Sequence, residues 1–171
     1  DLDALEDAYK SGAKVHLLSN PHNPIGIVYD RETLASIAVL AKKYGVVIIS
    51  DEIHAPLTYS EKKFTPFLSV SETAREVGIT ITSASKAFNL AGLKCAMIIT
   101  ENESLRDRIN VMPLAVAFRA SLFGATAATA AFQRGRPWLN SVIGLLDENR
   151  KLLKNLIDTK LPGVGYRVPD F

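Results

Sequence analysis

The chain has 171 residues, of which 47% are hydrophobic and 22% are charged, a balance typical of a folded globular protein rather than a disordered one. Its 20 basic and 18 acidic residues leave a formal net charge of +2, so the composition gives no indication of a nucleic-acid partner or an anionic membrane. No apolar run reaches the roughly 18 residues that a membrane-spanning helix requires. A chain of this length can form one domain that buries roughly two-thirds of its unfolded surface.

Four short runs rich in apolar and β-branched residues alternate with helical patterns along the chain. They predict strands over residues 15–20, 46–51, 79–83 and 96–100. The second run is almost continuously hydrophobic, which predicts a strand buried on both faces. Strands and helices that alternate through short links are typical of parallel sheets with right-handed crossovers. We therefore expect an α/β fold with three αβα layers and a mostly parallel sheet.

The helical patterns begin at the start of the chain, where Leu2, Leu5 and Tyr9 share one face. Asp30 and Gly45 are residue types that begin and end helices, which predicts a helix over 31–44. Further helices are expected over 70–77, 104–110, 122–134 and 137–160.

The end of the long last helix suggests a domain boundary. Pro162 and Gly163 follow it, so we expect residues 1–160 to form part of a large domain and residues 161–171 to begin a smaller one. The chain opens inside a predicted helix and stops in a strand-like stretch, which leads us to expect a piece of a longer protein. Cys95, the single cysteine, cannot form an internal disulfide, which favours a cytoplasmic location. Its apolar neighbours predict a buried thiol in a strand.

Polar residues follow three of the predicted strands, and ligands of open α/β sheets bind beyond the carboxyl ends of parallel strands. The first group, at 19–26, contains two Asn-Pro pairs and Gly26. Such a rigid turn can hold the amide of Asn23 in a fixed place, although the same residues also suit an ordinary loop. The second group begins with Asp51, a carboxylate that requires a cation or donors at the end of an apolar strand. A protonated heterocycle nitrogen would meet this need, and so would a helix N-cap or a buried salt bridge.

The third group combines hydroxyl and ammonium groups. Ser83, Ser85, Lys86 and Lys94 surround a predicted strand-to-helix turn, which is a suitable place for a phosphate. A partly desolvated lysine near a second cation has a lowered pKa and acts as a nucleophile. Lys86 could instead be a solvated surface lysine, but its apolar neighbours disfavour that interpretation.

The order and spacing of these groups resemble those of a known family. Asn23 precedes Asp51 by 28 residues, and Asp51 precedes Lys86 by 35. The pattern resembles the large domain of fold-type I pyridoxal-phosphate (PLP) enzymes, the class I/II aminotransferase superfamily. The sequence Asp-Glu-Ile-His from Asp51, together with Ser-Lys-Ala-Phe-Asn-Leu-Ala-Gly-Leu-Lys from Ser85, is similar to the MalY/PatB-type cystathionine β-lyase, or C–S lyase, branch.

The resemblance implies a role for each of these residues. It makes Lys86 the lysine that forms a Schiff base with PLP and then removes the substrate Cα proton, and it pairs Asp51 with the pyridine nitrogen. Asn23 donates to the phenolate oxygen, and a cis peptide often precedes the next proline, Pro24. The positions that match phosphate-binding residues of the family are Ser83, Ser85 and Lys94.

Two positions depart from aminotransferases of the aspartate type. His54 stands where those enzymes place a tyrosine that donates to the phenolate oxygen, although it could also be a packing histidine. Lys94 replaces an arginine, so a point charge replaces a bidentate phosphate contact. Both departures are familiar in the C–S lyase branch, which favours that branch.

The resemblance also implies an activity and an assembly. The intact enzyme would cleave cystathionine or a related L-cysteine thioether into a thiol, pyruvate and ammonia. The alternatives are an aminotransferase and a non-enzymatic, aminotransferase-like regulatory domain. A homodimer is expected, with residues 112–132 supplying either part of its interface or an ordinary buried helix. Several family groups that hold the cofactor and the substrate carboxylate have no counterpart here, so we expect this chain alone to be inactive.

Overall fold

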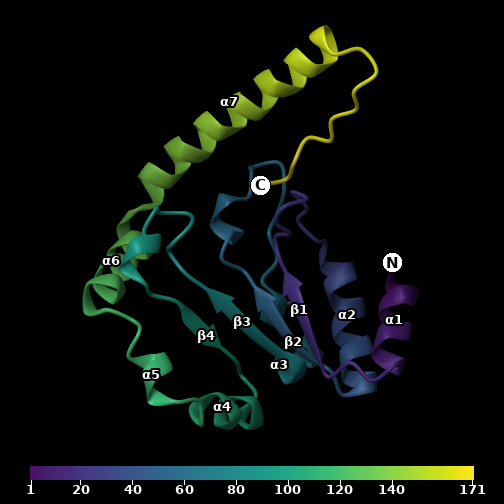
Figure 1. Ribbon diagram of the computed structural model, residues 1–171, viewed down its shortest axis with the longest axis vertical. Coiled ribbons are helices and arrows are strands. Elements are labelled where there is room, and N and C mark those ends of the chain that lie inside the picture. The colour runs from purple at the N-terminus through teal and green to yellow at the C-terminus, as the bar shows by residue number, and fades with distance from the viewer.

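The computed structural model describes residues 1–171, the side chain of Ala117 excepted. At its centre is a four-stranded sheet in the order β1–β2–β3–β4, drawn as arrows in Figure 1. The first three strands are parallel, and β4 is antiparallel to β3. The predicted α/β class with a mostly parallel sheet is therefore confirmed. The strands are β1 (Val15–Ser19), β2 (Val47–Asp51), β3 (Gly78–Thr82) and β4 (Met97–Ile99).

Apart from α5 (Leu114–Ala117), which was not predicted, the α-helices lie close to the predicted ranges, and the capping residues of α2 (Arg31–Tyr44) act as expected. The Asp30 carboxylate accepts a hydrogen bond from the backbone N–H of Thr33 at 2.7 Å, and Gly45 ends the same helix in the left-handed region, with φ 64°. The α-helices are α1 (Leu2–Lys10), α2 (Arg31–Tyr44), α3 (Glu72–Val77), α4 (Glu103–Asn110), α5 (Leu114–Ala117), α6 (Leu122–Arg134) and α7 (Arg136–Lys160). Short 3-10 helices are η1 (Ala55–Leu57), η2 (Phe67–Ser69) and η3 (Ala91–Leu93).

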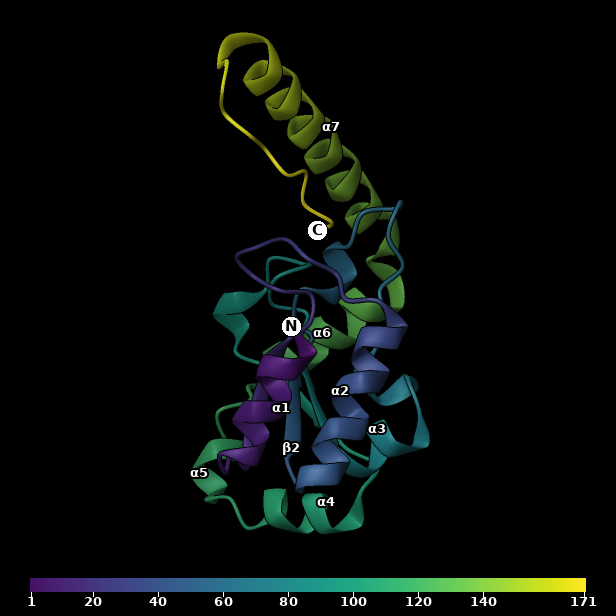
Figure 2. The same cartoon turned by 90° about the vertical axis from the view of Figure 1, so that its right-hand side faces the viewer.

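The hydrophobic core lies between the sheet and the layer formed by α1, α2 and α3. Leu18 of β1 and Ile48 of β2 point to this side and are buried with Leu34 and Ile37 of α2. Phe67, in η2, is completely buried in the same cluster. Figure 2 shows α1 and α2 side by side over the sheet, with α3 next to α2. This layer fixes the strands from one side and leaves their carboxyl ends at one edge.

The opposite face of the sheet is much less covered. Side chains alternate along a strand, so Leu17 points away from the core that holds Leu18, and Leu17 is 75% exposed. In β2, Val47 and Ile49 on that face are half-buried. The expectation that this strand is buried on both faces is therefore met only in part.

The prediction of a buried strand thiol at Cys95 is wrong. Cys95 lies in the irregular segment before β4 and is partly exposed. β4 is the last strand of the sheet, and its Met97 and Ile98 remain 40% and 45% exposed. An apolar run predicts a strand, but it does not predict whether another layer covers that strand.

The long helix α7 extends away from the body of the molecule, and the residues after it return towards the sheet (Figure 1). Pro137 occupies its first turn as expected, and Leu161 is its C-cap. Beyond residue 163 the chain has no regular secondary structure, so the strand-like stretch expected there is not a strand, and the chain ends beside the loops that follow β1 and β2. Within the described part of the chain, no helix is both long and apolar enough to cross a membrane.

Candidate functional site

The carboxyl ends of β1, β2 and β3 lie side by side and carry the first two predicted site segments directly after them. In the sheet, Ser19 is paired with Asp51, and Asp51 with Ile81. The pairing continues one residue further, because the N–H of Asn20 donates to the carbonyl of Asp51 at 2.9 Å and the N–H of Glu52 donates to that of Ile81 at 2.8 Å. Asp51 is thus held between its neighbours by the backbone on both sides.

The Asn-Pro segment after β1 forms a closed turn. The N–H of His22 donates to the carbonyl of Ile27, and the N–H of Gly26 donates to the carbonyl of His22. Asn23 lies at the exposed tip of this turn. The peptide bonds before Pro21 and Pro24 are both cis, the second as the resemblance implied. The amide of Asn23 is therefore accessible to a ligand and carried by a closed loop.

Asp51 ends β2 with an exposed side chain. Its Oδ1 atom accepts one hydrogen bond, from the backbone N–H of Ile53 at 3.1 Å. Among the described residues it takes part in no salt bridge, and the helix η1 that follows has His54 rather than Asp51 as its N-cap. The two structural alternatives, a helix cap and a buried salt bridge, are not what this carboxylate does.

His54 is partly buried and lies within electrostatic reach of two other predicted site residues. Burial lowers the pKa of the imidazole, the positive charge of Lys86 lowers it further, and the negative charge of Asp51 raises it. Charges influence one another strongly only over short distances in salt solution. Asp51 and Lys86 therefore both lie within electrostatic reach of His54.

The segment that carries Lys86 differs from its prediction in two ways. It is a series of turns followed by η3 rather than the start of an α-helix, and both Asn89 and Lys94 have φ values near +55°. Lys86 and Lys94 are exposed, so the expected partial desolvation of Lys86 is not observed. The exposure follows from its place in a turn beyond the last residue of β3, where no layer of the described chain covers it.

Ser83 and Ser85 of this segment form a hydrogen bond with each other. The hydroxyl oxygens of Ser83 and Ser85 lie 2.6 Å apart, and the Ser83 hydroxyl donates to the carbonyl of Cys95 at 2.5 Å. Ser83 is buried, whereas Ser85 is half-buried. Ser83 therefore ties the Lys86 turn to the segment before β4, and Ser85 is the more accessible hydroxyl of the pair.

Glu52 is an important residue at this edge that the sequence did not single out. Its side chain points to the core side of the sheet and is only 4% exposed. Its Oε1 atom lies within hydrogen-bond distance of the Ser50 hydroxyl (3.0 Å), the Phe67 backbone N–H (2.8 Å) and the Thr80 hydroxyl (3.4 Å). Burial raises the pKa of this carboxyl, and the neighbouring charge of Asp51 raises it further, against the opposing effect of the three donors. A glutamate directly after an apolar strand was the available signal.

Asn20 is a second buried polar residue that the sequence patterns do not indicate. It is completely buried, and its side-chain amide donates to the carbonyl of Thr65 at 3.2 Å. Its Oδ1 atom has no hydrogen-bond partner among the described residues. This hydrogen bond joins the start of the Asn-Pro turn to Thr65. Two residues further on, the backbone N–H of Phe67 donates to Glu52.

Comparison with known proteins gives a consistent assignment. The family model described as Aminotransferase class I and II matches residues 1–169. A candidate cystathionine beta-lyase of Mycobacterium tuberculosis is 46% identical over 177 residues, covering 99% of this chain and 43% of the relative. The cystathionine beta-lyase of Corynebacterium glutamicum is 40% identical over 170 residues, covering 99% of this chain and 45% of the relative.

A solved structure agrees with these relatives. The crystal structure of the PLP-bound C-S lyase from Staphylococcus hominis has a TM-score of 0.89 and 32% sequence identity, covering 99% of this chain and 43% of that one. The chain therefore spans less than half the length of the relatives that it matches.

Proposed function

This chain belongs to the class I and II aminotransferase family, and from that premise we propose that it is part of a PLP-dependent C–S β-lyase. The intact enzyme would act on cystathionine or a related L-cysteine thioether and release a thiol, pyruvate and ammonia. The observation that carries the proposal is that Asp51 ends β2, Lys86 follows the carboxyl end of the neighbouring strand β3, and both lie within electrostatic reach of His54. The similarity to two relatives named as cystathionine beta-lyases and to the C-S lyase of S. hominis supports the lyase branch.

The chemistry of the exposed groups fits PLP. Asp51 offers a carboxylate without a salt-bridge partner in the described chain, which suits a protonated pyridine nitrogen. Lys86 offers an accessible primary amine for the aldehyde. Asn23 can donate to the phenolate oxygen from its closed turn. These three residues lie at the same edge of the sheet, as a single ligand would require.

The other predicted contacts fit with one qualification. Ser85 and Lys94 are accessible to a phosphate, and Lys94 supplies a positive charge. Ser83 is buried and already donates to Cys95, so a direct phosphate contact by Ser83 would require its hydroxyl to turn. We propose that Ser83 supports the phosphate site chiefly by holding Ser85 in place.

The residues of the chain have distinct tasks in the proposed reaction. When bound, PLP supplies a ring that withdraws electrons from the substrate Cα. The Asp51 carboxylate stabilises the positive charge at the pyridine nitrogen, which keeps that withdrawal strong. The Lys86 amine accepts the Cα proton. His54 and Asn23, on the loops that follow β2 and β1, would orient the ring through hydrogen bonds to its phenolate oxygen.

The domain organisation is part of the same proposal. Residues 1–160 form part of the PLP-binding large domain, with α7 as its linking helix, and residues 161–171 begin a second, smaller domain. The relatives are more than twice as long as this chain. We therefore propose that the chain is a piece of the catalytic unit and does not turn over substrate by itself. The single Cys95 favours a cytoplasmic protein.

We propose a homodimer for the intact enzyme. Several large apolar side chains of α5, α6 and the residues around them are exposed, and exposed apolar surface of this kind favours an interface. Among them are Val111, Leu114, Phe118, Leu122 and Phe123. This supports the first of the two interpretations of residues 112–132, since these side chains are not buried within the chain.

Aminotransfer is the second candidate function, because the matching family model carries that name and the same residues would serve it. Product analysis of the longer protein separates the two reactions. Thiol and pyruvate formed from cystathionine without an oxo-acid acceptor indicate a lyase. Amino-acid formation that depends on an added oxo acid, without release of thiol, would contradict the lyase proposal.

A further inference from the structure

Residues 167–171, which we call the C-terminal strap, lie across the two loops that carry Asn23 and His54. The N–H of Asp170 donates to the carbonyl of Gly26 at 2.8 Å, and its Oδ2 atom accepts from the N–H of Val28 at 3.1 Å. The carbonyl of Asp170 accepts from the N–H of Tyr59 at 3.0 Å. One residue thus bonds to the Asn-Pro turn on one side and to the segment after η1 on the other.

Close packing supports this arrangement at both ends of the strap. A side chain at Gly26 would place its Cβ atom 2.5 Å from the Cβ of Pro169, so only glycine permits this approach, and Gly26 also has φ 67°. At the other end, the rings of Phe171 and His54 pack with their centroids 5.6 Å apart. Asp170 itself is only 8% exposed.

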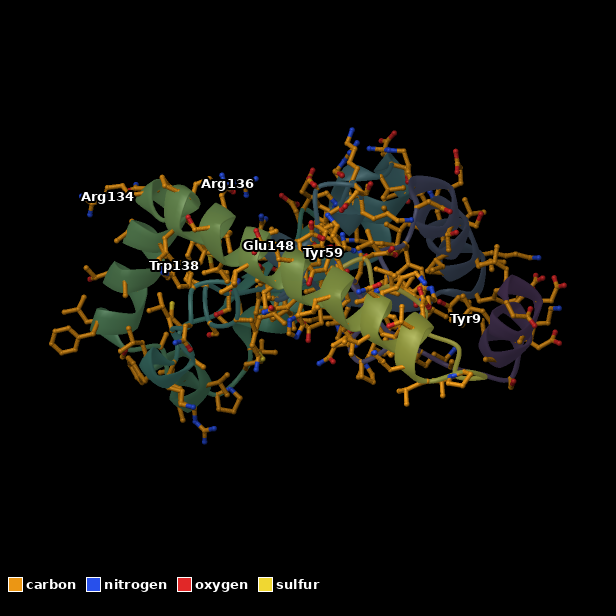
Figure 3. All side chains as sticks on the ribbon, turned by 90° about the horizontal axis from the view of Figure 1, so that it is seen from above. Tyr9, Tyr59, Arg134, Arg136, Trp138 and Glu148 are labelled. Carbon is orange, nitrogen blue, oxygen red and sulfur yellow. The ribbon has the colours of Figure 1, made fainter. Side chains whose placement is uncertain are left out.

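Arg150 attaches α7 to the same assembly. Its guanidinium lies over the ring of Tyr59, 3.7 Å from the centroid, and it donates to the carbonyl of Pro169 and to Asp147 and Glu61. Tyr59 lies beside α7 in Figure 3. The linking helix, the strap and the loop after η1 are therefore held together by one nearly buried guanidinium.

We propose that the C-terminal strap is a positioning element for the PLP site, with Asp170 and Phe171 as positioning residues that hold Asn23 and His54 in place relative to each other. The idea rests on the proposed function for the roles of Asn23 and His54. It adds that the first residues of the second domain fix the side of the site that faces the phenolate oxygen. A shift of that domain would then be transmitted directly to both ring-orienting residues.

The charge around Asp170 is consistent with an anchor rather than a ligand-binding group. Lys62 and Arg167 approach its carboxylate oxygens to 3.6 Å, and both cations have side chains that are more than half exposed. Its remaining contacts are to backbone atoms of the two loops. Asp170 therefore acts through the backbone that carries Asn23 and His54, not through a contact with substrate.

The first test uses the longer protein without PLP and NMR of two reporters, the Asn23 side-chain amide and the His54 ring. Asp170→Ala and Phe171→Ala should shift both reporters, and Asp170→Asn, which retains an acceptor for the Val28 N–H, should restore their wild-type positions. Lys154→Ala is the matched control, because Lys154 pairs with Asp158 on the exposed side of α7 and should change neither reporter.

The second test uses pyridoxal phosphate itself with the longer protein. Asp170→Ala should weaken PLP binding by up to about tenfold, the equivalent of one hydrogen bond, and should shift the absorbance band of the bound cofactor. The band reports the surroundings of the ring, which a general loss of stability would not move. Asp170→Asn should restore both.

The proposal is overturned if both reporters keep their wild-type positions in folded Asp170→Ala and the Asn23 amide keeps its position in folded Phe171→Ala. If Asp170→Ala does not fold, Phe171→Leu still decides through the Asn23 amide, because loss of the Phe171 ring current alters the His54 signal directly: a shifted Asn23 amide supports the strap, and an unchanged one rejects it. Failure of PLP to bind the wild-type protein would contradict the proposed function, whereas the NMR result on the ligand-free protein would stand.

Discussion

At the scale of single residues, the structure places a buried carboxylate directly behind an exposed one. Asp51 is exposed at the end of β2, and Glu52, next in sequence, points into the core and accepts from three donors. The same short sequence thus supplies the proposed PLP-binding carboxylate and a buried carboxyl group that ties the end of β2 to η2 and β3. The effect of Glu52 on the free energy of unfolding can be measured without a cofactor.

Replacement of Glu52 by glutamine should change how stability depends on pH. The folded state raises the pKa of this carboxyl above 4.5. Between pH 4.5 and the folded pKa, the folded protein therefore binds more protons than the unfolded one. The Glu52 contribution to the free energy of unfolding is therefore greatest below pH 4.5 and declines as the pH rises through the folded pKa. Urea unfolding of the wild type and Glu52→Gln at several pH values should show their difference changing in this direction. A difference that stays constant from about pH 4 to about pH 8 would show that the buried carboxyl does not titrate.

The ring of His54 provides a test of the site geometry. Lys86 lowers the pKa of His54 and Asp51 raises it, so Lys86→Gln should raise that pKa and Asp51→Asn should lower it. The titration can be followed by NMR of the imidazole protons. Lys94→Gln serves as the control, because Lys94 is not among the charges that act on His54. Equal effects of the Lys86 and Lys94 substitutions would show that Lys86 has no special proximity to the ring.

The sequence indicates the exposed polar residues at the strand ends better than the buried polar residues that stabilise the same edge of the sheet. Asn23, Asp51 and Lys86 follow apolar strands, and strand ends are visible in a hydrophobic pattern. Glu52 follows the same strand, but its direction depends on alternation at the strand end and on donors from η2 and β3. Those donors come from distant parts of the chain, so no local pattern predicts them.

At the scale of secondary-structure elements, α2 should be the most sensitive helix to a change on its buried face. Leu34 is completely buried beneath the sheet, whereas Val39 on the same helix is 59% exposed. Leu34→Ala should lower the free energy of unfolding by about 2–5 kcal/mol, and Val39→Ala should change it by less than about 0.5 kcal/mol. Chemical denaturation followed by circular dichroism measures both. Similar effects of the two substitutions would contradict the assignment of the core face.

Helix limits could be predicted because they depend on short-range contacts. Asp30 and Gly45 act at their own positions in the backbone, and their residue types are sufficient evidence. The antiparallel direction of β4 could not be predicted, because an apolar run has no direction of its own. The turns after Lys86 also depart from expectation, since Asn89 and Lys94 adopt positive φ values that interrupt a helix.

At the scale of the whole molecule, the exposed apolar surface around α5 and α6 should cause self-association. Phe118, Leu122 and Phe123 are each about 80% exposed, and surfaces of this kind favour association in water. Sedimentation velocity should show dimers or larger species whose fraction falls in Phe123→Lys. Val39→Lys is the matched control, since Val39 is an exposed apolar residue of α2, in the helical layer that covers the other face of the sheet. A monomeric wild-type chain at all concentrations would contradict this prediction.

The contacts that connect the two ends of the chain were beyond sequence-based prediction. The hydrogen bond from Val28 to Asp170 joins residues 142 positions apart, and neither residue belongs to a strand or helix of the structure. Such contacts depend on how α7 leads the chain back to the sheet (Figure 1). The family pattern indicated a site at the strand ends, but the strap that covers two of its loops required the three-dimensional structure.

Lys86 is the residue that we propose to bind PLP covalently. Borohydride reduction of the protein in the presence of PLP, followed by peptide mapping, should give a pyridoxyl group on Lys86, and Lys86→Arg should abolish it. Lys94→Ala should retain the label at Lys86, although with a weaker dependence on the phosphate group of the cofactor. A pyridoxyl group predominantly on another lysine, with Lys86 unmodified, would contradict the claim.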